Sequence, residues 1–252
     1  MAAVGCVIPA LDAADTVGAV VLALREALAA VRHERPEQDG GPAPIVIVVD
    51  DGSRDATAAI AAACADRVVR FPTTRGKGAA LRAGLALALT EGAERVLTID
   101  ADGQHDPSYA PALLAALECA DLAVGSRARR GTAMPWPRRV SNALSARLVS
   151  ACAGRAVPDS QSGFRALRAD TLRRLRPAGD GYEFETDMLI RAGRAGLRIA
   201  CVPIPTIYGA PSHFRPVRDT ARIARTIARA WIGRPWSAGA TTTIAARAAS
   251  RP

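Results

Sequence analysis

Two carboxylates, Asp100 and Asp102, stand two residues apart directly after the apolar run 95–99. Carboxylates so close together repel each other unless a cation joins them. A hard divalent ion takes oxygen ligands, including one or two carboxylates, and leaves positions for substrate phosphates. Gln104 offers a neutral oxygen nearby, whereas His105 is not expected to be a ligand of the ion. The spacing therefore indicates a divalent-cation site that could stabilise a departing diphosphate; a solvated turn with isolated acids is the alternative.

A second acidic pair, Asp50 and Asp51, follows the apolar run 45–49 and precedes Gly52, which permits a tight turn. Carboxylates at the end of a strand can accept hydrogen bonds from a base N–H or a ribose hydroxyl. This interpretation predicts a nucleoside beside the strand. The alternative is that both side chains only cap the following turn.

A glycine-rich segment forms the third motif, in which Gly76 and Gly78 flank Lys77 before a helical stretch. Main-chain N–H groups at the start of a helix can bind phosphate. The spacing differs from that of a P-loop, which disfavours a kinase or nucleoside triphosphatase. An ordinary glycine-rich turn is the alternative.

The segments that carry these motifs alternate between β-branched and Ala/Leu-rich composition. This rhythm predicts an α/β fold, a mostly parallel sheet with helices on both faces. Ligands of such sheets bind beyond the carboxyl ends of the strands, where both acidic pairs fall. The expected strands are 4–8, 45–49, 68–71, 95–99, 122–124, 164–167 and 197–202, and the expected helices are 16–30, 55–65, 78–90, 108–117, 138–152, a short one ending at 175, 184–195 and 217–231.

Composition and charge narrow the class of protein. The 252 residues suit one large α/β domain with a short appendage, and 49% hydrophobic residues support a sizeable core. The net charge of +9 points to an anionic partner, namely nucleic acid, a phosphate-bearing substrate or a membrane, unless it reflects a general arginine bias. Five cysteines without a C-x-x-C pair indicate small buried hydrophobes in a reducing compartment. No stretch is long or apolar enough for a span or a signal peptide, so we expect a soluble or peripheral protein.

The motifs and their order resemble family 2 glycosyltransferases, in particular the branch with dolichyl-phosphate mannose synthases and bacterial polyprenyl-phosphate glycosyltransferases. The resemblance covers about 4–215 and rests on VIPALDAADT, VVDDGSRDAT, GKGAALRAGL, TIDADGQHDP, VGSR and DSQSGFRALR. It implies a glycosyltransferase A-type (Rossmann-like) fold. It also implies inverting, metal-dependent transfer of a hexose, mannose or glucose, from GDP-mannose or UDP-glucose to a polyprenyl phosphate.

The resemblance also assigns site residues. It implies catalytic roles for Asp100, Asp102 and Arg127, and Mg²⁺ or Mn²⁺ at Asp102 and Gln104. Relatives usually carry Asn-Glu after the first strand, whereas this chain has Asp12 and Ala13, which leaves the donor base open; Asp12 or Asp15 could substitute. The residues expected to bind the donor are Pro9, Leu11, Asp50, Asp51, Lys77, Asp100 and Ala101.

Clustered arginines bear on the acceptor. A phosphate monoester is already ionised near neutral pH, so it needs cations to hold it rather than a general base. A hydroxyl acceptor on a soluble molecule or glycan is the alternative, with Glu185 or Asp187 as the base. The expected acceptor-phosphate residues are Arg138, Arg139, Ser141, Ser162, Arg165, Ser212 and Arg215.

The last predicted helix is amphipathic, with four arginines on one face and Ile223, Ile227 and Trp231 on another. It suits either an anionic membrane surface or docking on the core. We expect a catalytic domain over 1–215, this basic helix over 216–232, a flexible tail over 233–252, and a cytoplasmic protein peripheral at the inner face of the membrane. A non-catalytic protein that binds nucleotide-sugars or nucleic acid is the rival class, but aromatic residues are scarce and no nucleic-acid reader motif occurs.

Overall fold

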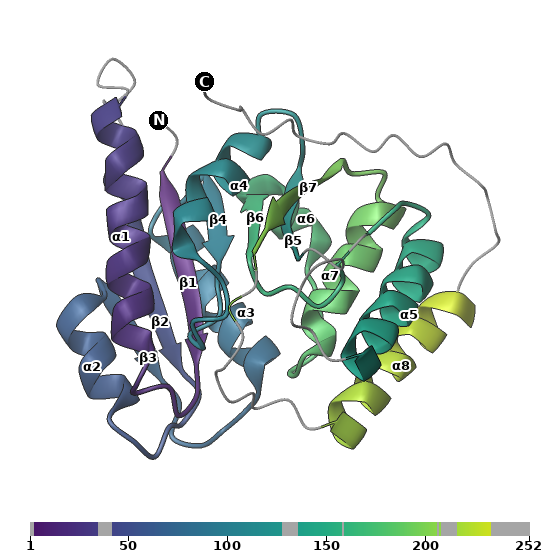
Figure 1. Cartoon of the computed structure of the whole chain (residues 1–252), viewed down its shortest axis with the longest axis horizontal. Helices are drawn as coiled ribbons and strands as arrows, with labels where there is room; N and C mark the ends of the chain where they lie inside the picture. The colour runs from purple at the N-terminus through teal and green to yellow at the C-terminus, as the bar shows by residue number, and fades with distance from the viewer. Residues whose placement is uncertain are drawn as a thin grey trace.

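The computed structural model describes residues 3–34, 42–127, 136–157, 159–205, 207 and 216–232. Within them one seven-stranded sheet runs through the centre in the order β3-β2-β1-β4-β6-β5-β7 (Figure 1). All neighbouring strands are parallel except that β6 runs antiparallel to β4 and β5. The strands are β1 (Val4–Ala10), β2 (Ile45–Asp50), β3 (Arg67–Arg70), β4 (Arg95–Thr98), β5 (Leu122–Arg127), β6 (Arg165–Arg168) and β7 (Ile199–Ile204).

Helices cover both faces of this sheet, as its strand composition requires. In β1, Cys6 and Ile8 point into one apolar cluster and Val7 into the other, because successive strand residues face opposite sides. On the first face lie α1 (Val17–Glu34), α2 (Thr57–Cys64) and α4 (Ala110–Ala116). On the second lie α3 (Lys77–Thr90), α5 (Trp136–Ala153), α6 (Ala169–Leu175), α7 (Glu183–Arg194) and α8 (Pro216–Ile232). The predicted α/β architecture is confirmed.

The ends of several elements differ from the prediction. Strands β5 and β7 pair from Leu122 with Ile199 to Arg127 with Ile204, so β5 is longer than expected and β7 begins later. The helix expected over 108–117 is divided into a 3-10 turn, η2 (Pro107–Tyr109), and α4. Pro111 lies in the first turn of α4, where a missing N–H is tolerated.

The amphipathic helix α8 docks on the core. Its residues Ile223, Ile227 and Ala230 are buried in the apolar cluster that α7 and α5 also enter. Ile223 and Ile227 of the predicted apolar stripe therefore pack on the core, whereas Trp231 is 54% exposed. The segment 233–252, expected to be a tail, lies outside the described residues.

Candidate functional site

The carboxyl ends of the parallel strands β3, β2, β1 and β4 meet at one edge of the sheet, and the acidic motifs lie there. Asp50 ends β2 and is fully buried. Its Oδ1 accepts a hydrogen bond from Ser53 N at 2.9 Å, and its Oδ2 lies 3.1 Å from Arg70 Nε without hydrogen-bond geometry. The Asp50 side chain therefore stabilises the turn, as the alternative interpretation expected, and the donor contact of Asp50 stays a prediction.

Asp51 connects the end of β2 to the glycine-rich segment. Its two carboxylate oxygens accept from Arg75 N at 2.7 Å and Gly76 N at 2.8 Å. Gly52 has a φ of +78°, and a Cβ there would lie 2.7 Å from the carbonyl carbon of Thr73, so only glycine permits this approach. Burial raises the pKa of Asp51, and the two main-chain donors offset this only in part.

Lys77, the first residue of α3, joins two carboxylates. Its Nζ lies 2.7 and 2.9 Å from the two oxygens of Asp100 and 3.0 Å from Glu185 Oε2, and the Tyr182 ring centroid is 5.2 Å away. Burial alone would lower the pKa of Lys77, but Asp100 and Glu185 outweigh it and raise the pKa. Burial alone would raise the pKa of Asp100, but Lys77 outweighs it and lowers the pKa. Glu185 was considered from sequence only as a base for a hydroxyl acceptor, because a salt bridge between residues so far apart in the chain leaves no local signal.

A bound cation would stabilise the charged form of the Asp102 carboxylate. Burial and the charge of Asp100 both raise its pKa. One of its oxygens, Oδ1, accepts from Gln104 N at 3.0 Å. Within the described part of the chain, no three His, Cys, Asp or Glu residues form a cage for a metal. The half-buried Asp102 carboxylate is an oxygen donor, and this fits an ion such as Mg²⁺ or Mn²⁺, which binds to one or two carboxylates and completes its coordination with substrate phosphates.

Arg127 ends β5 and pairs with Asp159. Its Nε and Nη2 donate to the two carboxylate oxygens at 2.7 and 3.0 Å, the bidentate geometry that best suits a guanidinium and a carboxylate. Burial alone would raise the pKa of Asp159, but the hydrogen bonds from Arg127 hold it below its ordinary value. The sequence singled out Arg127 but not its partner.

Arg165 and Ser162, both expected at the acceptor phosphate, are buried instead. Arg165 is 1% exposed and donates to the carbonyl oxygens of Ser162 (2.8 Å), Glu185 (2.7 Å) and Ser160 (3.1 Å). Ser162 is 0% exposed. This placement corrects the prediction: the guanidinium ties the loop before β6 to the first turn of α7, and that turn carries Glu185.

The other predicted residues divide into two groups. Pro9 and Ala101 are buried and Leu11 is half-buried at the ends of β1 and β4, and Ala101 O accepts from Thr16 Oγ1 at 2.6 Å. The remaining acceptor-phosphate residues lie outside the residues whose side chains the structure describes. They are Arg138, Arg139, Ser141, Ser212 and Arg215.

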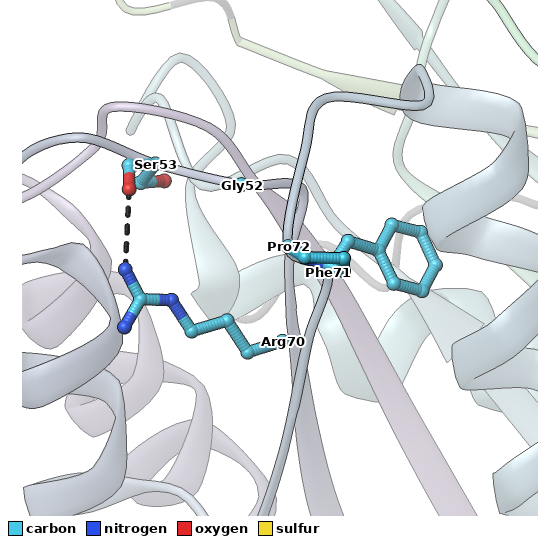
Figure 2. Close-up of a pocket in the computed structure, with 5 residues that line it drawn as sticks. All are labelled: Gly52, Ser53, Arg70, Phe71 and Pro72. Carbon is cyan, nitrogen blue, oxygen red and sulfur yellow. Dashed lines mark hydrogen bonds between the residues drawn. The ribbon is translucent and has the colours of Figure 1, made fainter.

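A cavity of about 340 Å³ lies beside the ends of β2 and β3, lined by Gly52, Ser53, Arg70, Phe71 and Pro72. Figure 2 shows Arg70 reaching toward Ser53, whose carbonyl oxygen accepts from Arg70 Nη2 at 3.4 Å, while the Phe71 ring points the other way. Neither Arg70 nor Phe71 belongs to one of the predicted sequence motifs.

Asp12 lies close to this cavity and has a structural role. Its main-chain N–H donates to Ser53 Oγ at 2.9 Å, and its Oδ1 accepts from Arg54 N at 2.8 Å. It therefore joins the loop after β1 to the turn after β2.

His105 is buried beside the site, with its ring centroid 5.7 Å from that of Phe164. Burial lowers the pKa of His105 to about 4. Its imidazole is consequently neutral at physiological pH and contributes packing rather than charge.

The chain is similar in sequence to known glycosyltransferases. A family model described as "Glycosyl transferase family 2" matches residues 6–176. An undecaprenyl-phosphate mannosyltransferase of Micrococcus luteus is 38% identical over 178 residues, which are 66% of this chain and 73% of the relative. A polyprenol monophosphomannose synthase of Mycolicibacterium smegmatis is 38% identical over 172 residues, 63% of this chain and 65% of the relative.

Solved structures agree on the fold. Glucosyl-3-phosphoglycerate synthase from Mycobacterium tuberculosis, in complex with Mn²⁺ and UDP-glucose, is 26% identical with a TM-score of 0.65, and the match covers 94% of this chain and 81% of that one. The fold is thus glycosyltransferase A-type. The sheet, the acidic motifs at its carboxyl edge and these matches together place the chain in glycosyl transferase family 2, as a glycosyltransferase.

Proposed function

We propose that this enzyme transfers a hexose, mannose or glucose, from GDP-mannose or UDP-glucose to a polyprenyl phosphate, with inversion and with a divalent metal. Relatives that are 38% identical carry the names undecaprenyl-phosphate mannosyltransferase and polyprenol monophosphomannose synthase. Those names support a lipid phosphate as the acceptor.

The observation that carries the proposal is the state of the two candidate bases. Glu185 Oε2 holds Lys77 at 3.0 Å. Asp187 Oδ2 accepts from Ala178 N at 2.8 Å and Arg191 Nε at 2.6 Å. One oxygen of each carboxylate is therefore paired with a cation, and Glu185 is only 4% exposed, which favours an acceptor that needs no base. A phosphate acceptor has no such need, because it is already ionised.

The donor would lie along the carboxyl edge of the sheet. Asp51, with Pro9 and Leu11, would face the nucleoside, and the start of α3 with Lys77 would face the diphosphate. Asp102 and Gln104 would hold the metal, which supplies charge stabilisation for the leaving diphosphate. Arg127 at the end of β5 would face the donor or acceptor phosphate. The acceptor phosphate would contact the other predicted residues, whose side chains lie outside the described part of the structure. They are Arg138, Arg139, Ser141, Ser212 and Arg215.

A soluble hydroxyl acceptor is the second candidate function. One observation favours it: the glucosyl-3-phosphoglycerate synthase structure, 26% identical, was solved with Mn²⁺, UDP-glucose and phosphoglyceric acid. The two candidates differ in whether the sugar ends on a lipid.

The test is a donor and acceptor panel. Purified enzyme receives radiolabelled GDP-mannose or UDP-glucose with Mn²⁺ or Mg²⁺, and either undecaprenyl phosphate in detergent or 3-phosphoglycerate. We expect label to pass into the organic phase only with the lipid, and EDTA to abolish this transfer. Label on 3-phosphoglycerate alone would overturn the lipid acceptor and establish the second candidate.

We further propose that the outer faces of α5 and α8 rest on the membrane. The two helices lie side by side (Figure 1). Leu144 and Leu148 are 56% and 38% exposed on α5, and Ile232 is 84% exposed at the end of α8. Arg225 and Arg229 are exposed on α8, so this helix pair exposes both apolar and basic side chains, as peripheral helices on anionic lipid do.

None of the described helices combines the length and apolar character that a bilayer-spanning segment needs. In the cell we expect peripheral attachment to the inner face of the membrane. Sedimentation with phosphatidylglycerol and with phosphatidylcholine vesicles tests this. The double variant Arg225→Gln/Arg229→Gln should bind anionic vesicles several-fold less than wild type. The matched control Arg173→Gln/Arg174→Gln removes the same charge from the exposed side of α6 and should bind like wild type; equal losses would overturn the assignment.

A further inference from the structure

Lys77 contacts the carboxylate of Asp100 from one side. Its Nζ lies 2.7 and 2.9 Å from the two oxygens of Asp100 and 3.0 Å from Glu185 Oε2. Only 12% of the Lys77 side chain is exposed, so water screens these contacts little.

The backbone of Gly163 confines the same carboxylate from another direction. A Cβ at Gly163 would overlap all three atoms of the Asp100 carboxyl group. Thr98, at the end of β4, donates to Gly163 O at 2.9 Å and holds that backbone in place. Asp100 is consequently held between Lys77 and the backbone of Gly163.

Asp102 differs in both respects. It is half-buried, and its Oδ2 accepts no hydrogen bond from the described residues, whereas its Oδ1 accepts only from Gln104 N. A divalent ion on Asp102 would lie near the ammonium of Lys77. Two cations this close repel strongly in a partly buried site unless anionic oxygens lie between them. The donor diphosphate would supply those oxygens.

We propose that Lys77 is a built-in counter-cation of Asp100 that makes metal binding depend on the donor's diphosphate. In the free enzyme Lys77 keeps Asp100 from acting as a metal ligand, and a metal ion binds weakly. The diphosphate brings enough negative charge for the ammonium and the metal to occupy the site together. The inference rests on the proposed metal-dependent function and gives Lys77 a positioning role that acts through Asp100.

Titration with Mn²⁺, followed by the electron paramagnetic resonance signal of the free ion, tests this without any turnover. For wild type we expect weak binding of Mn²⁺ alone and binding at least tenfold tighter with GDP or UDP present. Lys77→Met should bind Mn²⁺ alone at least tenfold more tightly than wild type, because Asp100 loses its counter-cation and becomes available as a ligand. The nucleotide should then improve its Mn²⁺ binding much less.

The double variant Asp100→Asn/Lys77→Met is the matched control, since it removes the carboxylate through which Lys77 acts. It should lose the tenfold gain of Lys77→Met, and it also serves if the single variant fails to fold by circular dichroism, because it buries one charge fewer. In that case the double variant is compared with Asp100→Asn, and equal Mn²⁺ affinity of the two is expected.

Two results separate the inference from the proposed function. If wild type binds Mn²⁺ more tightly with nucleotide but Lys77→Met binds Mn²⁺ alone no better than wild type, the role of Lys77 is overturned and the metal-dependent function stands. If wild type binds no Mn²⁺ with either nucleotide, the metal-dependent function is overturned, and the inference with it.

Discussion

The carboxyl edge of strands β1 to β4 and the region around β5, β6 and α7 hold most of their charged side chains by different contacts. At the carboxyl edge, apart from the pair of Lys77 with Asp100, Asp51 accepts from Arg75 N and Gly76 N, and Asp102 from Gln104 N. These are main-chain donors of the same or the next motif. In the second region, Arg127 pairs with Asp159 and Arg165 reaches three carbonyl groups on two segments.

A charged residue can be assigned from its motif where the strand end alone determines which way its side chain faces. A carboxylate at a strand end faces the ligand edge by construction, since strands β1 to β4 are parallel and end together. An arginine has a long side chain, and the packing of distant segments determines which groups it contacts. Three experiments probe this contrast, beginning with the largest expected effect.

Asp102→Asn should lower the rate of transfer by about 10²–10³-fold or more, because one negative charge at the metal and diphosphate is lost. The melting curve should stay close to that of wild type, since Asp102 makes only one local hydrogen bond. Asp106→Asn is the control: Asp106 lies in the same loop, and its side chain accepts from Ser108 N at 2.9 Å. Full activity of Asp102→Asn in the presence of a chelator would contradict the metal role.

Arg165→Met should lower the free energy of unfolding by about 3 kcal/mol, because it leaves three carbonyl groups without their charged donor. Urea denaturation measures this. The control Arg173→Met removes an exposed arginine of α6 and should change stability by less than about 0.5 kcal/mol. If Arg165→Met kept its stability and lost only affinity for the acceptor, Arg165 would be a phosphate ligand after all.

Asp159→Asn should lower the free energy of unfolding by about 2 kcal/mol at pH 7, because it breaks a buried pair with Arg127. Since the pKa of Asp159 is held below its ordinary value, the pair stabilises the fold above about pH 3.9 and loses this effect as pH falls through the folded pKa. Urea denaturation at pH 7 and pH 3 should therefore show a smaller loss at pH 3. The same loss at both pH values would show that shape, not charge, determines the role of Asp159.

Particular residues show which features the sequence alone predicts. The runs 45–49 and 95–99 are apolar and short, which is enough to predict buried parallel strands and therefore a shared edge with Asp51 and Asp102 on it. Gly52 and Gly76 mark turns, and the positive φ of both is observed. These features depend on local sterics and on burial, so the chain itself determines them.

Tertiary structure alone decided the rest. Lys77 and Glu185 are 108 residues apart in the chain, yet their charged atoms are 3.0 Å apart because α3 and α7 pack on the same face of the sheet. Arg165 has the same side chain as any solvated arginine, and only the position of β6 between β4 and β5 buries it. Burial and ion pairing are properties of assembled elements, so no pattern within a single segment encodes them.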